Sequence, residues 1–429
     1  MKFMKLFIFA TVLFFTLMIS TNNEVKAATT KIFVENYEVK ADVAPTLEKG
    51  RTLVEARSLF EALGLKMSYN AKTKLVIGEK DGLRIAMTIN SRTAKVNNQT
   101  VTLDVPAKIV KGRTIIPLRF VSEYSGADVD WNAESKEIRV NGVQFENAQF
   151  GKYIRNLLHI TNKKMPVLKT DLAKLTTLNL RDETIPERPY KIYFDSLVDF
   201  RYFTGLTSLD VYGTFTSLEP LAKLTNLTSL YVGGEVKTLN GLQNLTKLTH
   251  LEVYGDHNIN ISALNNKINL TNLVINGVSQ EQLPIIGNLK NLQSLSIEQG
   301  TFTNIESLKN LTKLRTLQLN NTPLTSIQTV KFMPDLTRLV IVNANVQSLN
   351  GIENLTKLSM LSLYNNDIQD LSPLANLPEL AILSLENNDI RSVEPLSKLT
   401  KLEKVFLKGN NIESIESIQQ LPALTLIDY

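Results

Sequence analysis

Residues 358–423 read LSMLSLYNNDIQDLSPLANLPE, LAILSLENNDIRSVEPLSKLTK and LEKVFLKGNNIESIESIQQLPA, which are three copies of one 22-residue phrase. A leucine opens each copy, and the same spacing runs through Leu270, Leu292, Leu314, Leu336, Leu358, Leu380, Leu402 and Leu424. A period in this range is the mark of a stacked, open array in which each repeat contacts only its neighbours. The sequence therefore predicts a solenoid over its C-terminal half.

The apolar positions of each copy predict the path of one coil. With the opening leucine as position 0, positions 3 and 5 are apolar and position 4 lies between them, as in a half-buried strand. Leu383 and Leu385 should face the core, and Ser384 should face outward. Further apolar residues follow at a three-residue step, which suits 3₁₀ turns on the return side: Ile390, Val393, Leu396 and Leu399.

An asparagine at position 8 is the polar signature of the last three full copies: Asn366, Asn388 and Asn410. Backbone groups at a bend lack strand partners, so these amides are expected to bond to the backbone as a structural ladder. The middle copies carry other residues at position 8, among them Val278, Gly300 and Thr322. We therefore expect the middle coils to be less regular.

The phrase resembles the bacterial leucine-rich repeat of the internalin type, LxxLxLxxNxIxxLxxLxxLxx, over residues 175–429. The resemblance implies a parallel β-sheet on the concave face of a solenoid and 3₁₀ or irregular structure on the convex side. Ahead of it, residues 143–174 are predicted to form a helical cap, because one helix face would carry Phe150, Tyr153, Ile154, Leu157 and Leu158. No clear cap is recognised at the C-terminal end, which leaves two alternatives: a closing strand formed by Leu424, Leu426 and Ile427, or association of the chain through that edge.

The region before the cap is an internal duplication with an offset of 62 in the numbering. VKADVAPTLEKGRTLVEARSLFEALG, from Val39, aligns with VTLDVPAKIVKGRTIIPLRFVSEYSG, from Val101. Identical residues include Asp42/Asp104, Arg51/Arg113 and Gly64/Gly126. Each copy predicts strands followed by a short helix and a return strand, so this is an α+β module.

This duplication resembles the copper amine oxidase N-terminal-like, or stalk, domain found on exported proteins of Gram-positive spore-formers. The motifs GRTLV…FEALG and KGRTIIPLRFVSEYSG carry the resemblance. It implies a spacer or docking role, and no amine oxidation, because the histidines (His159, His250 and His257) all lie outside the module. The predicted domains are residues 1–27, a signal peptide; 28–142, the stalk domain; 143–174, the cap; and 175–429, the repeats.

Export is predicted from residues 1–27, where MKFMK precedes an apolar run, Leu6–Ile19, and Val25-Lys26-Ala27 is a small-residue cleavage site. This run is shorter than the roughly 20 residues that a helix needs to span a bilayer. There is no cysteine, which excludes disulfides. The chain is thus predicted to be secreted or cell-surface, with cell-wall association a further expectation and no membrane span after cleavage.

The outward side chains of the concave face are the predicted ligand-binding surface. Exposed aromatic residues on a rigid scaffold favour recognition. They suggest two clusters, although tyrosine and valine also suit strands without any ligand. The candidate residues are Tyr212, Tyr231, His250 and Tyr254 in the first cluster, and Arg338, Val340, Val342, Tyr364 and Phe406 in the second.

Neither catalysis nor a cofactor is predicted. The sequence has no Gly-x-Ser-x-Gly, phosphate loop or His-Glu-x-x-His motif. His250 and His257 fall on different faces of one coil, which is a poor arrangement for a metal. The formal charge of +5 gives no basis for nucleic-acid binding. The sequence therefore favours a non-enzymatic binding protein for a host or bacterial surface protein or a glycan. The alternative is a structural cell-envelope protein with the stalk domain as docking module.

Overall fold

The computed structural model describes residues 30–180 and 192–429, which form two compact units. The N-terminal unit comprises residues 30–144 with Ile160–Thr170, and the repeat unit comprises Phe145–His159 with Asp171–Tyr429. The predicted cap segment, residues 143–174, is therefore divided between them. Ile160–Thr170 of this segment belong to the N-terminal unit. Leu168 is buried in the core of that unit, and the Val143 amide donates to the Val167 carbonyl at 2.7 Å. The predicted signal peptide lies outside the described residues.

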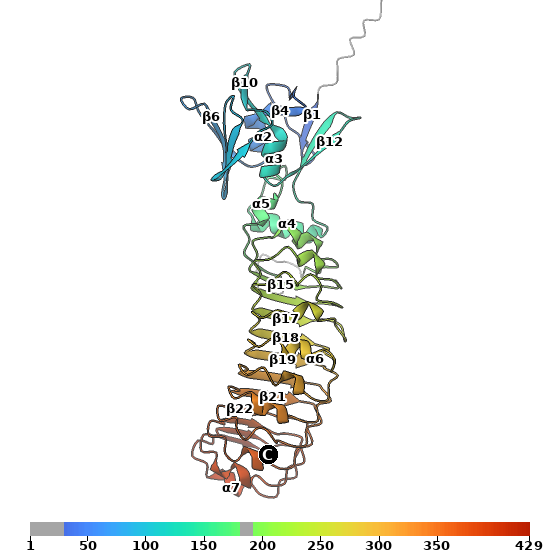
Figure 1. Ribbon diagram of the computed structural model, residues 1–429, viewed down its shortest axis with the longest axis vertical. Coiled ribbons are helices and arrows are strands. Elements are labelled where there is room, and N and C mark those ends of the chain that lie inside the picture. The colour runs from blue at the N-terminus through green and yellow to red at the C-terminus, as the bar shows by residue number, and fades with distance from the viewer. Residues whose placement is uncertain (1–29, 181–191) are drawn as a thin grey trace, which may run out of the picture. The chain divides into compact units, whose positions relative to one another are not determined.

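The N-terminal unit repeats its elements at the predicted offset (Figure 1). The first copy contains β1 (Lys31–Val34), β2 (Tyr37–Glu38), β3 (Thr46–Glu48), β4 (Arg51–Glu55), α2 (Ala56–Ala62), β5 (Lys66–Asn70) and β6 (Leu75–Lys80). The second contains β8 (Thr93–Val96), β9 (Gln99–Thr102), β10 (Lys108–Val110), β11 (Arg113–Pro117), α3 (Leu118–Tyr124), β12 (Asp128–Asn132) and β13 (Glu137–Asn141). The strand β7 (Leu83–Thr88) joins the two copies.

The two copies exchange strands across three sheets. A central sheet has the order β10-β11-β4-β3, so the copies meet where β11 runs antiparallel to β4. The β1–β2 hairpin of the first copy pairs with β13 of the second, in the order β12-β13-β1-β2. The β8–β9 hairpin of the second copy follows β7 onto the first copy, in the order β5-β6-β7-β8-β9. Each copy thus completes a sheet of the other.

Identical residues of the two copies form reciprocal ion pairs between them. Arg51 Nε contacts Asp104 Oδ2 at 2.7 Å, and Arg113 Nη2 contacts Asp42 Oδ2 at 2.5 Å. The arginine of each copy therefore binds the aspartate of the other. A common core lies beneath, and its fully buried side chains include Phe60, Ile85, Ile116 and Val121.

The repeat unit is built on one parallel sheet of twelve strands in sequence order, as the leucine period predicts (Figure 1). Each strand begins two residues after the opening residue of its copy. The strands are β14 (Thr177–Asn179), β15 (Ser208–Tyr212), β16 (Ser229–Gly233), β17 (His250–Tyr254), β18 (Asn272–Asn276), β19 (Ser294–Glu298), β20 (Thr316–Asn320), β21 (Arg338–Val342), β22 (Met360–Ser362), β23 (Ile382–Ser384), β24 (Lys404–Phe406) and β25 (Leu426–Asp428). The last of these is the predicted closing strand.

Short helices lie on the opposite side of most coils. Most are 3₁₀ helices, as the three-residue apolar step predicts: η1 (Val198–Tyr202), η2 (Glu219–Leu221), η3 (Ser262–Leu264), η4 (Glu306–Leu308), η5 (Gln328–Phe332), η6 (Ser372–Leu374) and η7 (Glu394–Lys398). Two are α-helical, α6 (Leu283–Gly287) and α7 (Glu416–Gln419), and α5 (Lys169–Leu172) precedes β14.

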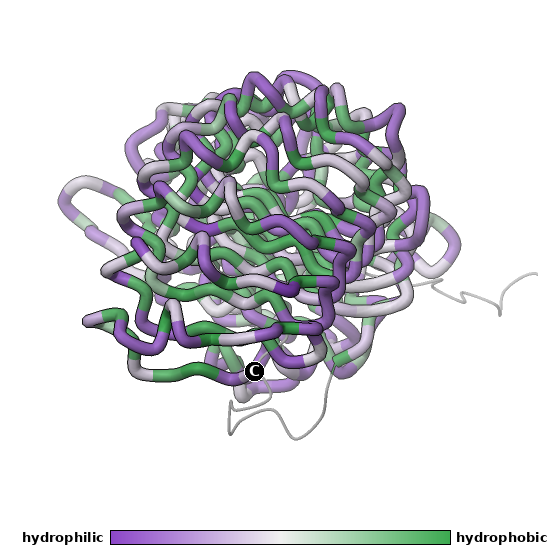
Figure 2. The backbone as a smooth tube through the Cα atoms, turned by 90° about the horizontal axis from the view of Figure 1, so that it is seen from below, coloured by the Kyte–Doolittle hydropathy of each residue, from purple (hydrophilic) through white to green (hydrophobic). Residues whose placement is uncertain are grey.

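Aliphatic side chains fill the space between the sheet and these helices. Leu383 and Leu385 are fully buried, as are Ile390 and Leu396 on the return side, so the predicted inward positions are confirmed. The view from the C-terminal end shows hydrophobic segments gathered inside the coils and hydrophilic ones at their outer bends (Figure 2). Burial of a large aliphatic side chain contributes roughly 1.5–3 kcal/mol, and several recur in every coil.

The position-8 asparagines form the predicted structural ladder. The Asn388 amide nitrogen donates to the carbonyls of Leu363 and Leu385 at 2.9 and 3.0 Å, and its Oδ1 accepts from the Ile368 amide at 3.0 Å. Asn366 and Asn410 repeat this pattern. The asparagine side chain thus donates to a backbone carbonyl of the preceding coil, such as that of Leu363, in place of a backbone amide of the following strand.

The lengths of the strands agree with this replacement of a backbone donor by the asparagine side chain. Strands β22 to β24, in the asparagine-bearing copies, are shorter than β15 to β21, with three residues instead of five. The expectation of less regular middle coils is therefore wrong for the sheet. Without the asparagine amide, the backbone ladder extends further. The departure lies on the return side, where α6 replaces a 3₁₀ turn.

A helix covers the first coils, as predicted. Helix α4 (Ala148–Leu157) buries Phe150, whose ring centroid lies 5.0–5.7 Å from those of Phe145, Phe194, Phe200 and Phe203. Asp199 accepts hydrogen bonds from the Glu146 and Asn147 amides at 2.8 and 2.9 Å, which anchors the start of the helix. This aromatic cluster closes the end of the leucine core.

Candidate functional site

The outward face of the twelve-stranded sheet presents side chains in straight rows. Successive strands pair in phase, so position 4 of one copy lies beside position 4 of the next, as in Asp210↔Tyr231↔Glu252↔Val274. Neighbouring members of a row are roughly 4.8 Å apart, the spacing of paired strands. A second row, at position 6, contains Tyr212↔Gly233↔Tyr254. Sequence distance therefore converts directly into distance on this face.

Three predicted tyrosines come together on β15 to β17. The rings of Tyr231 and Tyr254 have centroids 5.7 Å apart at an interplanar angle of 47°. Tyr212 belongs to the same row as Tyr254, with Gly233 between them. Tyr212 is 39% exposed, so part of this cluster faces solvent.

Two residues that the sequence analysis did not identify complete the cluster. Tyr193 lies ahead of β15 and is 52% exposed, and its ring centroid is 5.9 Å from that of Tyr212. A Cβ on Gly233 would lie 2.6 Å from Tyr212 Cδ2 and 3.2 Å from the Tyr231 hydroxyl, so glycine lets both side chains lie over the backbone. Tyr193 lies outside the regular phrase, but Gly233 could have been found as the only glycine at position 6. We call Tyr193, Tyr212, Tyr231 and Tyr254 the tyrosine platform.

Carboxylates adjoin the tyrosine platform. The Tyr254 hydroxyl donates to Glu252 Oε1 at 3.3 Å. Burial, followed by the charge of Glu252, raises the pKa of Tyr254 to about 12. The phenol therefore stays protonated above the pH at which an ordinary tyrosine loses its proton. Glu298 on β19 adds to the same effect.

His250 is not part of the tyrosine platform. It begins β17 and Tyr254 ends it, so the two side chains lie at opposite ends of the strand. The His250 ring lies 2.8 Å from the Thr249 hydroxyl, through Nδ1. Among the described residues, no group of three or more His, Asp or Glu side chains is placed to hold a metal ion.

The second predicted cluster is not contiguous. Val342 and Tyr364 occupy position 6 in adjacent copies, but Phe406 lies two strands beyond β22, with Ser384 between it and Ser362. Arg338 is at the opposite end of β21 from Val342. Val340 is 8% exposed and contributes little surface. Because every copy has the same length, the sequence alone did not show that these residues lie on non-adjacent strands or at opposite ends of a strand.

A second asparagine ladder, which the sequence analysis missed, borders the sheet face at position 7. Asn343 Nδ2 donates to Asn321 Oδ1 at 2.8 Å, and Asn365 Nδ2 donates to Asn343 Oδ1 at 2.9 Å. These residues have φ of 54–56°, a backbone conformation that asparagine tolerates better than most residues. Its signal was visible in the sequence as an asparagine at position 7 of consecutive copies.

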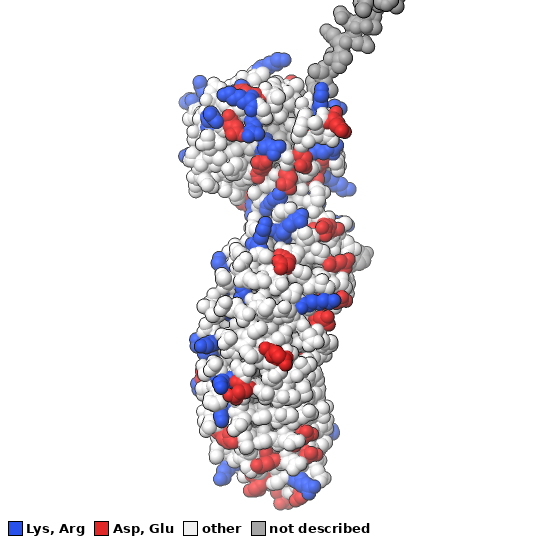
Figure 3. Space-filling model, turned by 45° about the vertical axis from the view of Figure 1, so that its right-hand side comes forward, with Lys and Arg blue, Asp and Glu red and all other residues white. Residues whose placement is uncertain are grey.

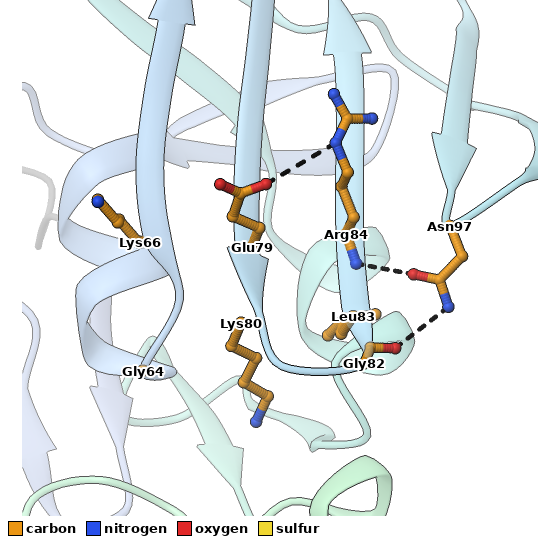
Figure 4. Close-up of a pocket in the computed structure, with 8 residues that line it drawn as sticks. All are labelled: Gly64, Lys66, Glu79, Lys80, Gly82, Leu83, Arg84 and Asn97. Carbon is orange, nitrogen blue, oxygen red and sulfur yellow. Dashed lines mark hydrogen bonds and ion pairs between the residues drawn. The ribbon is translucent and has the colours of Figure 1, made fainter.

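The N-terminal unit has a shallow hollow of about 740 Å³ beside the β6–β7 turn (Figure 4). Its polar groups mainly hold that turn. Asn97 Oδ1 accepts from the Arg84 amide at 2.8 Å, and Asn97 Nδ2 donates to the Gly82 carbonyl at 3.3 Å. Arg84 Nε also lies 3.8 Å from Glu79 Oε2, while Lys66 and Lys80 point away from that pair. These contacts stabilise the β6–β7 hairpin.

Acidic and basic side chains are interspersed on the face of the molecule that Figure 3 shows. No broad basic stripe appears on that face. In residues 30–180 and 192–429, no helix has both the length and the apolar character needed to cross a bilayer.

Comparisons with known proteins agree with this division of the chain. Residues 33–140 match the family model of the copper amine oxidase N-terminal domain, and residues 356–398 and 378–423 match that of leucine-rich repeats. No curated protein matches the sequence.

Solved structures that are similar to the chain include two proteins of Listeria monocytogenes. An internalin (inlF) is 26% identical with a TM-score of 0.49, and the match covers 66% of this chain and 96% of that one. The functional domain of InlJ is 19% identical with a TM-score of 0.50, covering 66% of this chain and 59% of that one. The latter likeness shows a shared fold. The chain therefore combines a region that matches the copper amine oxidase N-terminal domain with a leucine-rich repeat array that shares its fold with the functional domain of InlJ.

Proposed function

We propose that this protein is a secreted or cell-surface, non-enzymatic binding protein that recognises a protein partner through the outward sheet face of its repeat unit. The observation that carries the proposal is the tyrosine platform, which consists of two ring pairs, Tyr193 with Tyr212 and Tyr231 with Tyr254, near the start of the sheet. Tyrosine combines a large apolar area with a polar hydroxyl, and it is enriched where proteins bind one another.

The rigidity of the sheet supports this role. Strands β15 to β17 hold Tyr212, Tyr231 and Tyr254 on fixed rows, and the leucine side chains beneath them are buried. Side chains that are already ordered lose little conformational entropy when a partner binds. A contact surface of this kind can therefore recognise a partner without first folding around it.

Alanine substitution of Tyr212, Tyr231 and Tyr254 together tests the proposal. We expect the purified wild-type protein to capture a specific protein from host or bacterial surface extracts, and the triple variant to bind that protein at least about tenfold more weakly. The matched control replaces Tyr364 and Phe406, aromatic residues of the same face, with alanine. Unchanged affinity in the triple variant, or equal loss in the control, would reject the tyrosine platform as the contact surface.

A second candidate function, docking of the N-terminal unit to the cell envelope, is favoured by a different observation. Exposed apolar side chains occur at matched positions of its two copies. Leu47 and Ile109 are 75% and 50% exposed on the two edge strands of the central sheet, and Tyr69 and Trp131 are 40% and 51% exposed on β5 and β12. Duplicated apolar exposure of this kind suits a repetitive surface such as cell wall.

Sedimentation of the protein with purified cell wall tests this second candidate. We expect the wild-type protein to pellet, and the Tyr69→Ser and Trp131→Ser double variant to stay in solution. The triple tyrosine variant of the repeat unit serves as the control and should pellet normally. Pelleting of the double variant would remove the support for docking through these residues.

A further inference from the structure

We propose that a second site on the sheet face binds an extended acidic segment of a protein partner. The site is one row of side chains on β21 to β24, which we call the cation-flanked row: Arg338, Met360, Ile382 and Lys404. It lies on other strands than the tyrosine platform. The inference therefore goes beyond the proposed function and does not depend on it.

The four residues are consecutive members of the position-2 row. Arg338 pairs with Met360, Met360 with Ile382, and Ile382 with Lys404 in the parallel sheet. Two apolar side chains therefore lie between two cations. Paired strands are about 4.8 Å apart, so three steps place Arg338 and Lys404 about 14 Å from each other along the sheet.

The two cations are exposed, and the apolar residues between them are half-buried. Neither cation forms an ion pair within residues 30–180 and 192–429, although Glu403 precedes Lys404 in the chain. Lys401, which lies just before the same strand, differs because it binds Glu379 at 2.6 Å. The charges of Arg338 and Lys404 are therefore available to a carboxylate from another molecule.

The row contains no anion of its own. Across the twelve described strands of the sheet, no position-2 residue is acidic. The residues that continue the row on either side are Thr316 and Leu426, which are both uncharged. Complementary charge draws a partner toward an interface and sets its position there. The row is therefore complementary to a segment that carries carboxylates at its two ends.

Small side chains lie beside the apolar centre of the row. Ser362 and Ser384 follow Met360 and Ile382 at position 4 of the same strands. The Ser362 hydroxyl donates to the Ser384 hydroxyl at 3.3 Å, and the Ser384 hydroxyl donates to Glu386. Both hydroxyl hydrogens are thus already bonded, so an apolar group placed over them leaves no donor unpaired. Methionine also adapts its shape to a partner.

An extended peptide matches the spacing of the row. A strand advances about 3.3 Å per residue and its alternate side chains face the same way, so residues i and i+4 lie about 13 Å apart with residue i+2 between them. A helix repeats one face at i+7 and i+11, at about 10.5 and 16.5 Å, which agrees less well with the row. The expected partner segment is therefore acidic, any residue, apolar, any residue, acidic.

Binding of short labelled peptides to the full protein, measured by fluorescence anisotropy, tests the inference. The first peptide is Gly-Ser-Glu-Thr-Leu-Thr-Glu-Ser-Gly, which we call the acidic peptide. Three comparison peptides replace both glutamates with glutamine, replace the leucine with serine, or reorder the residues so that the glutamates are adjacent. We expect the acidic peptide to bind about fivefold or more tightly than each of them, and less tightly at high salt.

Charge variants of the protein locate the site. Arg338→Gln with Lys404→Gln should weaken binding of the acidic peptide about fivefold or more. The control is Lys408→Gln, which removes a 73% exposed cation of the same coil outside the row and should leave binding unchanged. Arg338→Glu with Lys404→Glu should instead favour a peptide with lysine in place of both glutamates. Such a reversal requires a folded sheet, so it separates lost charge from lost structure.

A second pair of variants tests the apolar centre. Met360→Ser with Ile382→Ser should also weaken binding of the acidic peptide about fivefold or more, because the leucine of the peptide loses its contact. Val342→Thr, at position 6 of the same face, is the matched control and should bind normally. Circular dichroism and thermal unfolding check that each variant is folded.

The inference is overturned if the acidic and glutamine peptides bind equally, if the reordered peptide binds as well, or if Lys408→Gln causes an equal loss. A sulfated oligosaccharide is a separate probe. If it binds through Arg338 and Lys404 while the acidic peptide does not bind, the row takes an anionic glycan and the inference fails. The triple tyrosine variant should bind the acidic peptide normally, so this result and that of the proposed function can fail separately.

Discussion

The two units both arise from repetition, but they use repeated residues in opposite ways. In the N-terminal unit two copies close on each other, so Arg51 binds Asp104 of the second copy and Arg113 binds Asp42 of the first. In the repeat unit each copy contacts the next in the same register, so Asn388 bonds to the preceding coil and Asn410 bonds to the coil of Asn388. The N-terminal unit is complete after two copies. The repeat unit adds copies along one axis, which leaves one face of its sheet uncovered along its whole length.

The largest expected effect compares core substitutions in the two units. Leu383→Ala and Ile116→Ala each truncate a fully buried side chain, which costs about 2–5 kcal/mol of unfolding free energy. In the open array the loss should remain near the substituted coil. In the closed unit both copies should weaken, because Ile116 pairs with Val54 of the first copy.

Hydrogen-exchange mass spectrometry distinguishes these outcomes. Leu383→Ala should increase exchange in β22 to β24 and leave β15 to β17 nearly unchanged. Ile116→Ala should increase exchange in β4 and β11 alike. A uniform increase across the whole repeat unit after Leu383→Ala would show that the array unfolds as one block and would weaken the distinction between stacking and closure.

The next effect compares the two asparagine ladders of the repeat unit. Asn388→Ala leaves the buried carbonyls of Leu363 and Leu385 with a lost donor, at a cost of about 1–3 kcal/mol for each unsatisfied group. Asn365→Gly removes one exposed side-chain bond, to Asn343, and glycine accepts the φ of 56° at this residue. This substitution should lower stability far less, as surface substitutions usually do. Urea unfolding measures both. Equal losses would mean that the outer ladder is as structural as the inner one.

A smaller effect concerns a lysine in a core position. Lys267 is 5% exposed, its ammonium donates to the Gln243 carbonyl at 2.7 Å, and burial lowers its pKa below the ordinary 10.5. The unfolded chain therefore binds this proton more tightly than the folded one. The free energy of unfolding should thus rise with pH between the lowered pKa and 10.5. Below the lowered pKa, Lys267 is charged in the folded protein, and the buried charge destabilises the fold to its full extent.

Replacement of this lysine by methionine tests that linkage. Lys267→Met should stabilise the protein by about 1 kcal/mol at neutral pH, because an apolar chain replaces a buried charge. The gain should shrink as the pH rises toward 10.5. Thermal unfolding at a series of pH values measures it, with Lys313→Met, an exposed lysine of another coil, as control. A gain that does not vary with pH would contradict the assigned cause.

The smallest expected effect concerns the reciprocal ion pairs that join the copies of the N-terminal unit. The Arg51 and Arg113 side chains are 48% and 50% exposed. Solvent screens such charges, so each pair should contribute no more than about 1 kcal/mol. A double-mutant cycle with Arg51→Ala and Asp104→Ala measures the coupling. A coupling well above this, or one unaffected by salt, would show that the pairs hold the copies together more strongly than exposure indicates.

The fold was largely predictable from the sequence because both units repeat. The leucine period determined which side chains are buried, and the offset between the two N-terminal copies placed every matched strand of that unit. Strand exchange was not predictable, because β1 pairs with β13 at the far end of the unit and no local pattern records that choice. The role of Asp199 at the start of α4 was also absent from the periodicity.

The candidate site was predictable in part for the same reason. Tyr231 and Tyr254 adjoin because their positions in successive copies are neighbours on the sheet. Tyr193 was missed because it precedes β15 and lies outside the repeated phrase. Phe406 was grouped with Tyr364 although β23 lies between their strands, so the two residues are not neighbours on the sheet. Periodicity predicts rows well, but it does not by itself show which members of different rows meet.

The exchanged hairpins of the N-terminal unit also bear on how such a module can originate. A lone copy would leave its β1–β2 hairpin without the β13 strand that it pairs with, which the second copy supplies. One copy is therefore half of a fold, and a separate half could reach the same pairing only by associating with an identical chain. Genetic fusion of such a dimer, together with the addition of β7 between β6 and β8, would yield the present arrangement.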